Sequence, residues 1–331
     1  MVRTGRTIFA IQAAAVAILL ASATGVCAQN NPYKEDGWAK LPEGRSLGWM
    51  SAIDIDRSGN IWVFERCGAN TCAGSSVAPV IKFDSTGRYL MSFGAGMFVY
   101  PHGIHIDRDG SIWVTDAKGK DGKGNVVVKF SPEGKVLLTL GKPGVAGNGE
   151  DTFNEPSDVV TGANGDIFVA DGHGGNSNAR IVKFSRDGKF IATWGKKGIG
   201  PGEFDTPHAL AIDSTGRLFV GDRANSRIQI FDQDGKFLSE WRQFGRPSGI
   251  FIDASDTLFV ADHQSDAKLN PGFKRGVRIG SARDGTVTSL IPGVGAQPET
   301  QSVGEGVIVD AAGSVYWSET RGMTVRKFVR K

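Results

Sequence analysis

The residues most suited to chemistry are two histidines and a glutamate, His102, His208 and Glu305, which occupy one position in three copies of a repeated motif. The other three copies carry serine at this position: Ser51, Ser157 and Ser248. Two imidazoles and a carboxylate can bind Zn²⁺ and leave a coordination position open for water or substrate. The same donor set suits non-haem Fe(II). The pattern therefore predicts a metal site, and the alternative is that these side chains only form hydrogen bonds around a channel.

The repeat itself predicts short β-strands. Each copy has an alternating apolar strand, a turn rich in glycine and small polar residues, and a second strand that ends in an acid. An aromatic residue recurs near the end of each copy: Trp62, Trp113, Phe168, Phe219, Phe259 and Tyr316. Six residues earlier, five copies have aspartate and one has glycine: Asp56, Asp107, Gly162, Asp213, Asp253 and Asp310.

These units predict an all-β, six-bladed β-propeller with four-stranded blades. A further hairpin follows each copy, so a unit supplies four strands, and a single such sheet cannot bury both of its faces. Only 21 residues follow Asp310, so the last blade lacks its outer strand. We expect the N-terminal segment around residues 38–41 to supply that strand and close the ring. Alternate blades of such a ring are about 120° apart, so His102, His208 and Glu305 should converge on its axis.

The residues after the second strand should surround the same mouth of the propeller. This strand ends in an acid in every copy, and we expect these acids to bind loop amides: Glu65, Asp116, Asp171, Asp222, Asp262 and Glu319. The next one or two positions vary and include Arg66, His173, Arg223 and His263. Arg66 and Arg223 could hold a substrate carboxylate in a bidentate manner. The alternative for both is a salt bridge to the neighbouring acid, and the sequence leaves open whether His263 belongs to the site.

The N-terminus predicts export. Arg3 and Arg6 precede an apolar run over residues 8–23, and a small residue precedes a cleavage point near Ala28, as in a secretory signal peptide. We therefore expect residues 1–28 to be removed, and residues 29–331 to form one propeller domain in the periplasm or outside the cell. The apolar run is too short for membrane insertion. In an oxidising compartment Cys67 and Cys72 predict a disulfide, and a metal site is the weaker alternative.

The charge balance argues against a nucleic-acid partner. The formal net charge is +3, from 38 basic and 35 acidic residues, and the segment predicted to be cleaved carries two of the positive charges. A nearly neutral protein has no general attraction for nucleic acid or for an anionic membrane. We expect a small-molecule or peptide-like, anionic substrate instead, and the sequence does not determine the oligomeric state.

The Phe-x-x-Pro spacers, the D-x-x-G turns and the K-F-x-x-x-G-K hairpins resemble NHL repeats over essentially the whole mature chain. Within such repeats, the site residues resemble the lyase domain of the peptidylglycine α-amidating enzyme. That family of zinc-dependent six-bladed propellers splits a peptidyl-α-hydroxyglycine into a peptide amide and glyoxylate. Its zinc histidines lie in P-H-G-L and P-H-S-L motifs, which residues 101–104 (P-H-G-I) and 207–210 (P-H-A-L) resemble. Its D-R-E-N-G-R-I-Q stretch is similar to residues 222–229, and its catalytic arginine in F-H-R corresponds to Arg66.

Three departures from the family pattern bear on function. Glu305 stands where the family has its third zinc histidine, and a carboxylate can still bind the metal. Gly306 replaces the calcium-binding aspartate of the family, which makes a structural calcium doubtful. His173 replaces the catalytic tyrosine, and a histidine can act as the general base or acid.

Three functional hypotheses follow. The first is a metal-dependent lyase or hydrolase that cleaves a C–N or C–O bond, with zinc as the expected metal and iron as the alternative. In it, His102, His208 and Glu305 bind the metal, His173 transfers a proton, and Arg66 and Arg223 orient the substrate. The second is a non-enzymatic NHL-type propeller that binds a peptide, glycan or protein. The third is a lactonase of the gluconolactonase type, although such enzymes use carboxylates and amides to bind calcium, which paired histidines do not fit.

Overall fold

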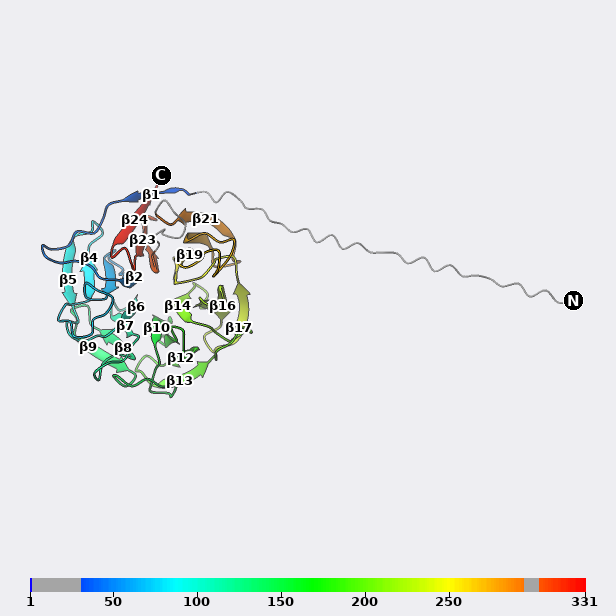
Figure 1. Cartoon of the computed structure of the whole chain (residues 1–331), viewed down its shortest axis with the longest axis horizontal. Helices are drawn as coiled ribbons and strands as arrows, with labels where there is room; N and C mark the ends of the chain where they lie inside the picture. The colour runs from blue at the N-terminus through cyan, green and yellow to red at the C-terminus, as the bar shows by residue number, and fades with distance from the viewer. Residues whose placement is uncertain (2–30, 295–303) are drawn as a thin grey trace.

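Six four-stranded antiparallel sheets are arranged as blades around a central axis (Figure 1). The computed structural model describes residues 1, 31–294 and 304–331, so the predicted signal peptide lies outside the described residues except for Met1. The described residues form strands and turns only. Within these residues, no helix has the length and hydropathy needed to cross a membrane. The propeller predicted from the repeat is therefore confirmed, with six blades of four strands each.

The strands of each blade are connected consecutively, from the axis to the rim. Blade 1 consists of β2 (Met50–Ile55), β3 (Ile61–Glu65), β4 (Val80–Phe83) and β5 (Tyr89–Phe93). Blade 2 consists of β6 (Pro101–Ile106), β7 (Ile112–Asp116), β8 (Val126–Phe130) and β9 (Val136–Leu140). Blade 3 consists of β10 (Pro156–Thr161), β11 (Ile167–Asp171), β12 (Arg180–Phe184) and β13 (Phe190–Trp194).

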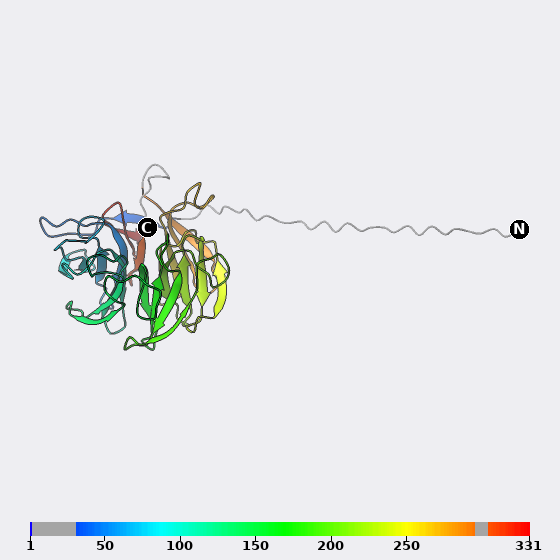
Figure 2. The ribbon, with the colours of Figure 1, turned by 60° about the horizontal axis from the view of Figure 1, so that its bottom comes forward.

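The second half of the ring repeats this order. Blade 4 consists of β14 (Pro207–Ile212), β15 (Leu218–Asp222), β16 (Arg227–Phe231) and β17 (Phe237–Trp241). Blade 5 consists of β18 (Gly249–Ile252), β19 (Thr257–Asp262), β20 (Gly276–Ser281) and β21 (Val287–Pro292). Blade 6 consists of β22 (Gly306–Val309), β23 (Val315–Ser318), β24 (Val325–Arg330) and, at its outer edge, β1 (Tyr33–Asp36). Figure 2 shows the ring tilted, with the strands of the green and yellow blades upright in its wall.

The ring is closed by β1, which pairs antiparallel with β24 from Tyr33 opposite Arg330 to Asp36 opposite Lys327. The prediction that an N-terminal strand closes the ring is confirmed, but the strand lies at Tyr33–Asp36 and not around residues 38–41. Trp38 is 7% exposed and packs against Phe83 of blade 1 and Tyr316 of blade 6, at centroid distances of 5.3 and 5.2 Å. The apolar side chains after β1 therefore seal the junction between the first and last blades, and the more polar β1 forms the exposed edge.

The repeated aspartate and a polar aromatic side chain stabilise the turn inside three of the blades. Asp56 accepts hydrogen bonds from the backbone N–H groups of Ser58 and Asn60 and from the indole of Trp62. The equivalent contact in blade 2 joins the Trp113 indole to Asp107 at 3.0 Å. In blade 6 the Tyr316 hydroxyl donates to Asp310 at 2.9 Å, so the spacing of six residues reflects one hydrogen bond across the hairpin in blades 1, 2 and 6, whereas blades 3, 4 and 5 have phenylalanine, which cannot donate.

Trp38→Ala should lower the free energy of unfolding by about 3–5 kcal/mol, because it leaves a cavity between the first and last blades. Urea denaturation followed by tryptophan fluorescence and circular dichroism measures the change. Leu137→Ala is the matched control, since that side chain is 50% exposed on an outer strand and its loss should cost less than about 1 kcal/mol. Equal effects of the two substitutions would contradict a sealing role for Trp38.

Candidate metal centre

The predicted metal ligands lie together at one end of the propeller axis. His102 and His208 are at the starts of β6 and β14, and Glu305 comes immediately before β22. Their exposed fractions are 2%, 2% and 5%. One donor atom from each of them, and one from His173, lie within 4.8 Å of one another.

A break in strand pairing occurs at the two ligand histidines. In blades 1 to 4, the pairing between the two inner strands shifts register at the position of the ligand or serine. In blade 4, Pro207 pairs with Asp222 and Ala209 with Gly221, so His208 lies outside the regular ladder. Such bulges reorient a side chain next to functional sites. The register shift recurs in the repeat, so every blade that has it presents this position to the centre.

Each ligand histidine is held by the backbone of the next blade. His102 Nδ1 lies 2.6 Å from the carbonyl oxygen of Ser157, and His208 Nδ1 lies 2.6 Å from that of Ser248. A carbonyl oxygen can only accept, so Nδ1 carries the proton in both rings and Nε2 presents a lone pair. Burial, with the charge of a neighbouring group adding to it, lowers the pKa of both histidines, so both imidazoles are neutral near pH 7.

The lone pair of His208 faces a carboxylate. His208 Nε2 lies 3.1 Å from Glu305 Oε1, and among the described residues neither this nitrogen nor His102 Nε2 has a hydrogen-bond partner. Glu305 is ionised beside Arg223, whose Nη1 lies 3.0 Å from the same Oε1 atom, because a neighbouring positive charge favours the carboxylate form. Several acceptors without a proton donor between them repel one another, and a cation bound among them removes that repulsion. The donor set therefore fits a divalent metal ion.

Glu305 also interacts with Arg223 and His263. Arg223 is 7% exposed, and its Nη1 donates to Glu305 Oε1 at 3.0 Å. His263 Nε2 lies 4.0 Å from the same oxygen, and His263 Nδ1 is 2.7 Å from the hydroxyl of Ser248. The structure therefore places Arg223 on the glutamate rather than on its neighbouring acid Asp222, which pairs with Arg227 at 2.8 Å.

Arg66 is buried next to the metal centre without an acidic partner. It is 2% exposed, and within the described part of the chain it forms no salt bridge. Its Nε donates to the carbonyl oxygen of Pro101 at 3.0 Å, and Nη1 donates to Asn70 at 2.8 Å. The neighbouring acid, Glu65, pairs with Arg45 instead, at 2.6 Å. The alternative of a salt bridge between Arg66 and Glu65 is therefore wrong for the described residues.

Tyr100 lies between the basic groups at this mouth and was not identified in the sequence. The Arg66 guanidinium is 3.8 Å from the centre of its ring, and Lys118 Nζ is 4.5 Å from it. The backbone N–H of Tyr100 donates to Asp116 at 2.5 Å, which illustrates how the acids that end the second strands bind loop amides. In the sequence, Tyr100 is distinguished only by lying two residues before His102, and this position does not indicate that its ring stacks on a guanidinium.

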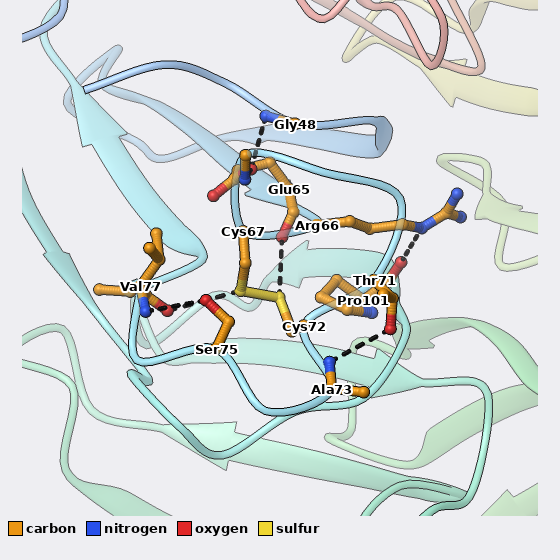
Figure 3. The surroundings of a disulfide bond; sticks show 12 residues. Gly48, Glu65, Arg66, Cys67, Thr71, Cys72, Ala73, Ser75, Val77 and Pro101 are labelled. Carbon is orange, nitrogen blue, oxygen red and sulfur yellow. Dashed lines mark hydrogen bonds between the residues drawn. A yellow bond between two sulfur atoms is a disulfide. The ribbon is translucent and has the colours of Figure 1, made fainter. Parts of the chain in front are cut away.

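A disulfide between Cys67 and Cys72 closes the loop that follows Arg66 (Figure 3). The loop contains Asn70, which binds the Arg66 guanidinium, and Thr71, whose hydroxyl donates to the carbonyl oxygen of Val99 at 2.9 Å. The disulfide predicted from the sequence is thus present, and its loop contacts both the arginine and the segment that leads to His102.

His173 approaches the centre from the loop between β11 and β12. Its ring lies 4.4 Å from that of His102 and 5.2 Å from that of His208, between centroids. Its Nδ1 lies 3.9 Å from Glu155 Oε2. Burial, with His102 and His208 adding to it, lowers its pKa well below the ordinary value.

A cavity of about 440 Å³ runs along the axis from His102 and His208 between the inner strands. The fifth histidine, His105, lines this cavity rather than the metal centre. Its Nε2 is 2.9 Å from the Thr161 hydroxyl and its Nδ1 is 3.4 Å from Asp54, so it links blades 1, 2 and 3.

Comparison with known proteins defines the class. Residues 153–243 match the family DUF5128, described as a 6-bladed beta-propeller. NHL repeat-containing protein 3 from Homo sapiens is 33% identical over 249 residues, which cover 73% of this chain and 65% of that protein. The protein is therefore a six-bladed β-propeller, and its sequence resembles that of an NHL repeat-containing protein.

Amidating enzymes are among the relatives. The peptidyl-α-hydroxyglycine α-amidating lyase 1 of Drosophila melanogaster is 30% identical over 213 residues, covering 55% of this chain and 37% of that protein. The peptidyl-glycine α-amidating monooxygenase of Mus musculus is 35% identical over 201 residues, covering 53% of this chain and 20% of that protein. The chain thus spans less than two thirds of the curated relatives it matches, and it resembles the amidating lyases within the shared region.

Solved structures agree on the fold. A gluconolactonase from Xanthomonas campestris has a TM-score of 0.59 at 16% identity, covering 86% of this chain and 87% of that chain. Virginiamycin B lyase from Staphylococcus aureus has a TM-score of 0.56 at 16% identity, covering 89% of this chain and 84% of that chain. At these identities the likeness concerns the propeller alone.

Replacing both cysteines, Cys67→Ser and Cys72→Ser, should lower the free energy of unfolding by about 2 kcal/mol, because the short loop then gains conformational freedom in the unfolded chain. Urea denaturation with and without a reducing agent measures this: the reductant should destabilise the wild type and leave the variant unchanged. The metal content should be equal in both, since neither cysteine is in the donor group. Loss of metal from the variant would show that the loop is part of the centre.

Proposed function

We propose that this protein is a metal-dependent lyase that cleaves the C–N bond of α-hydroxyglycine-type substrates. The observation that carries the proposal is the pair of proton-free Nε2 atoms, on His102 and His208, that share a buried site with the Glu305 carboxylate. A binding scaffold has no need for such an arrangement, because buried acceptors without donors destabilise a fold.

His102, His208 and Glu305 would hold the metal. Imidazole and carboxylate ligands suit zinc or iron, and a bound divalent ion supplies Lewis acidity toward a substrate oxygen. The two carbonyl groups that accept from Nδ1 fix the tautomer of each ring, a common support for metal-bound histidines. Arg223 holds the glutamate in place from its other side.

Arg66 would bind the substrate carboxylate. Its guanidinium is buried and has neutral partners only, so an anion at this point gains a charge-assisted contact without displacing another acid. Tyr100 and the disulfide loop limit the conformations of the arginine, which lowers the entropy lost on binding. We therefore expect Arg66, on this side of the mouth, to recognise the negative charge of the substrate.

The proposed reaction needs no redox partner. An N-acyl-α-hydroxyglycine loses its C–N bond, the electron pair stays on nitrogen, and the hydroxyl oxygen becomes the aldehyde oxygen of glyoxylate. The hydroxyl proton leaves oxygen and a proton is gained by nitrogen, so the products are an amide and glyoxylate. His173 is predicted from the sequence to act as the general base or acid, but the balance of this reaction is the same whichever group transfers the proton.

The relatives support this chemistry, since two of them have names that state amidating activity. We further propose that the protein is exported, in agreement with the disulfide and with the predicted signal peptide.

Metal content tests the centre directly. Elemental analysis by mass spectrometry should find about one zinc or iron ion per chain, and the double variant His102→Ala/His208→Ala should lose it. His105→Ala is the control, because His105 lies in the axial cavity outside the donor group and its removal should keep the metal. A wild-type protein that binds no metal after reconstitution would refute the proposal.

Turnover tests the substrate. N-benzoyl-α-hydroxyglycine should yield benzamide and glyoxylate, and Arg66→Gln should lower kcat/KM by roughly 10- to 100-fold through loss of a charge-assisted contact. Lys118→Gln is the control at the same mouth, because its ammonium stacks on Tyr100 at the outer side. An Arg66→Gln variant with wild-type kcat/KM would contradict carboxylate binding by this arginine.

A non-enzymatic binding propeller is the second candidate. The match to NHL repeat-containing protein 3 covers more of this chain than the matches to the amidating enzymes do, and the name of that protein states no activity. A metal-free protein that captures a peptide or glycan would favour this candidate over the lyase.

A further inference from the structure

We propose that His173 is a fourth protein ligand, so that the centre is a three-histidine, one-carboxylate site. The inference rests on the metal dependence proposed above. It starts from one distance. Four donor atoms, one each from His102, His173, His208 and Glu305, all lie within 4.8 Å of one another. One ion can be reached by all four side chains after small adjustments, since donors around a single ion lie about 3–4 Å apart.

The backbone around His173 is built to hold the ring there. The N–H groups of His173 and Gly174 both donate to the Ser177 hydroxyl at 2.9 Å. The N–H of Gly172 donates to the carbonyl oxygen of Glu155 at 3.0 Å. Gly172 has φ of +150°, and a Cβ at this position would collide with the carbonyl oxygen of Asn178. Glycine is thus required immediately before His173, and the loop has little freedom to withdraw the ring.

The packing of the rings is compatible with one shared metal ion. The three imidazoles of His102, His173 and His208 lie 4.4–5.2 Å apart between centroids, at interplanar angles of 39–73°. Three imidazoles this close together can contribute one nitrogen each to a single ion, and imidazole nitrogen is a common metal ligand.

A carboxylate also lies beside the ring of His173. Glu155 Oε2 is 3.9 Å from His173 Nδ1, which exceeds a hydrogen-bond distance, so a small movement of either side chain would complete the carboxylate–histidine contact that often supports metal-bound histidines. Glu155 itself has φ of +65° and directly precedes Pro156, the first residue of β10. The backbone of Glu155 is thus positioned by the same strand that brings Ser157 to His102.

A fourth ligand changes which metals suit the site. A tetrahedral zinc ion with four protein ligands has no open position, whereas catalysis needs one. Fe²⁺, Mn²⁺, Co²⁺ and Ni²⁺ accept five or six ligands and keep room for substrate beside three imidazoles and a carboxylate. The inference therefore favours a metal of higher coordination number, or a zinc ion that becomes five-coordinate.

Cobalt loading tests the inference without an activity assay. The metal-free protein is loaded with Co²⁺, its dissociation constant is measured by competition with a chelator, and X-ray absorption counts the imidazoles bound. We expect three imidazoles in the wild type and two in His173→Ala, with an affinity loss above the 10- to 100-fold that removal of an outer-shell partner causes. The matched control is His105→Ala, which should keep three imidazoles and wild-type affinity.

The outcomes separate this inference from the proposed function. Two imidazoles in the wild type, or unchanged cobalt affinity in His173→Ala, would overturn the fourth ligand and leave the lyase proposal intact. Three imidazoles in a protein that does not cleave N-benzoyl-α-hydroxyglycine would support the ligand and refute the substrate. Circular dichroism of His173→Ala shows whether its fold is intact, and His173→Gln, which keeps a side chain of similar size, repeats the test if alanine destabilises the loop.

Discussion

The hydrogen bond from each ligand histidine to the backbone of the next blade connects the chemistry of the centre to the geometry of the ring. His102 of blade 2 depends on blade 3, and His208 of blade 4 depends on blade 5. The serines that alternate with the ligands are part of the same system, because the hydroxyl of Ser51 donates to the carbonyl oxygen of His102 and that of Ser157 to the carbonyl oxygen of Pro207. Any change in the angle between neighbouring blades therefore alters the direction of an Nε2 lone pair in the candidate metal centre.

The charges around the centre are unevenly distributed. Glu305 is the acid inside it, and Arg223 compensates that charge directly. Arg66 lies within the same buried mouth and contacts only neutral groups, so the site with a divalent ion carries an excess of positive charge. Burial of uncompensated charge costs free energy that the fold must supply elsewhere, here through the disulfide loop and the stacking on Tyr100. An anion that enters this mouth recovers part of that cost, which is a physical basis for selectivity.

The sequence predicts the positions of residues on the repeated strands, because the repeat aligns them. It does not predict the positions of residues in loops, which have no common register. The column that contains His102, His208 and Glu305 could be aligned because each blade supplies it from the same inner strand. The closing strand was displaced, because Trp38 has the apolar character of a strand while the more polar Tyr33–Asp36 forms the edge. Tyr100 carries no motif, so its stacking was invisible in the sequence. His173 was singled out by its column, but its distance from the other rings depends on a glycine-rich loop, which no periodicity describes.

The pairing of β1 with β24 sets an order of events during synthesis. The ion pair between Glu35 and Arg326 joins residues 291 positions apart, so the first strand of the propeller must wait for nearly the whole chain. Glu305 belongs to the last blade. A nascent chain that has not yet reached Glu305 contains the histidines of the centre but lacks its carboxylate. Contacts of such long range form slowly, and unfinished blades expose strand edges in the meantime. A truncated or stalled polypeptide thus has neither a closed ring nor a complete donor set, and its unpaired strand edges can pair with other chains.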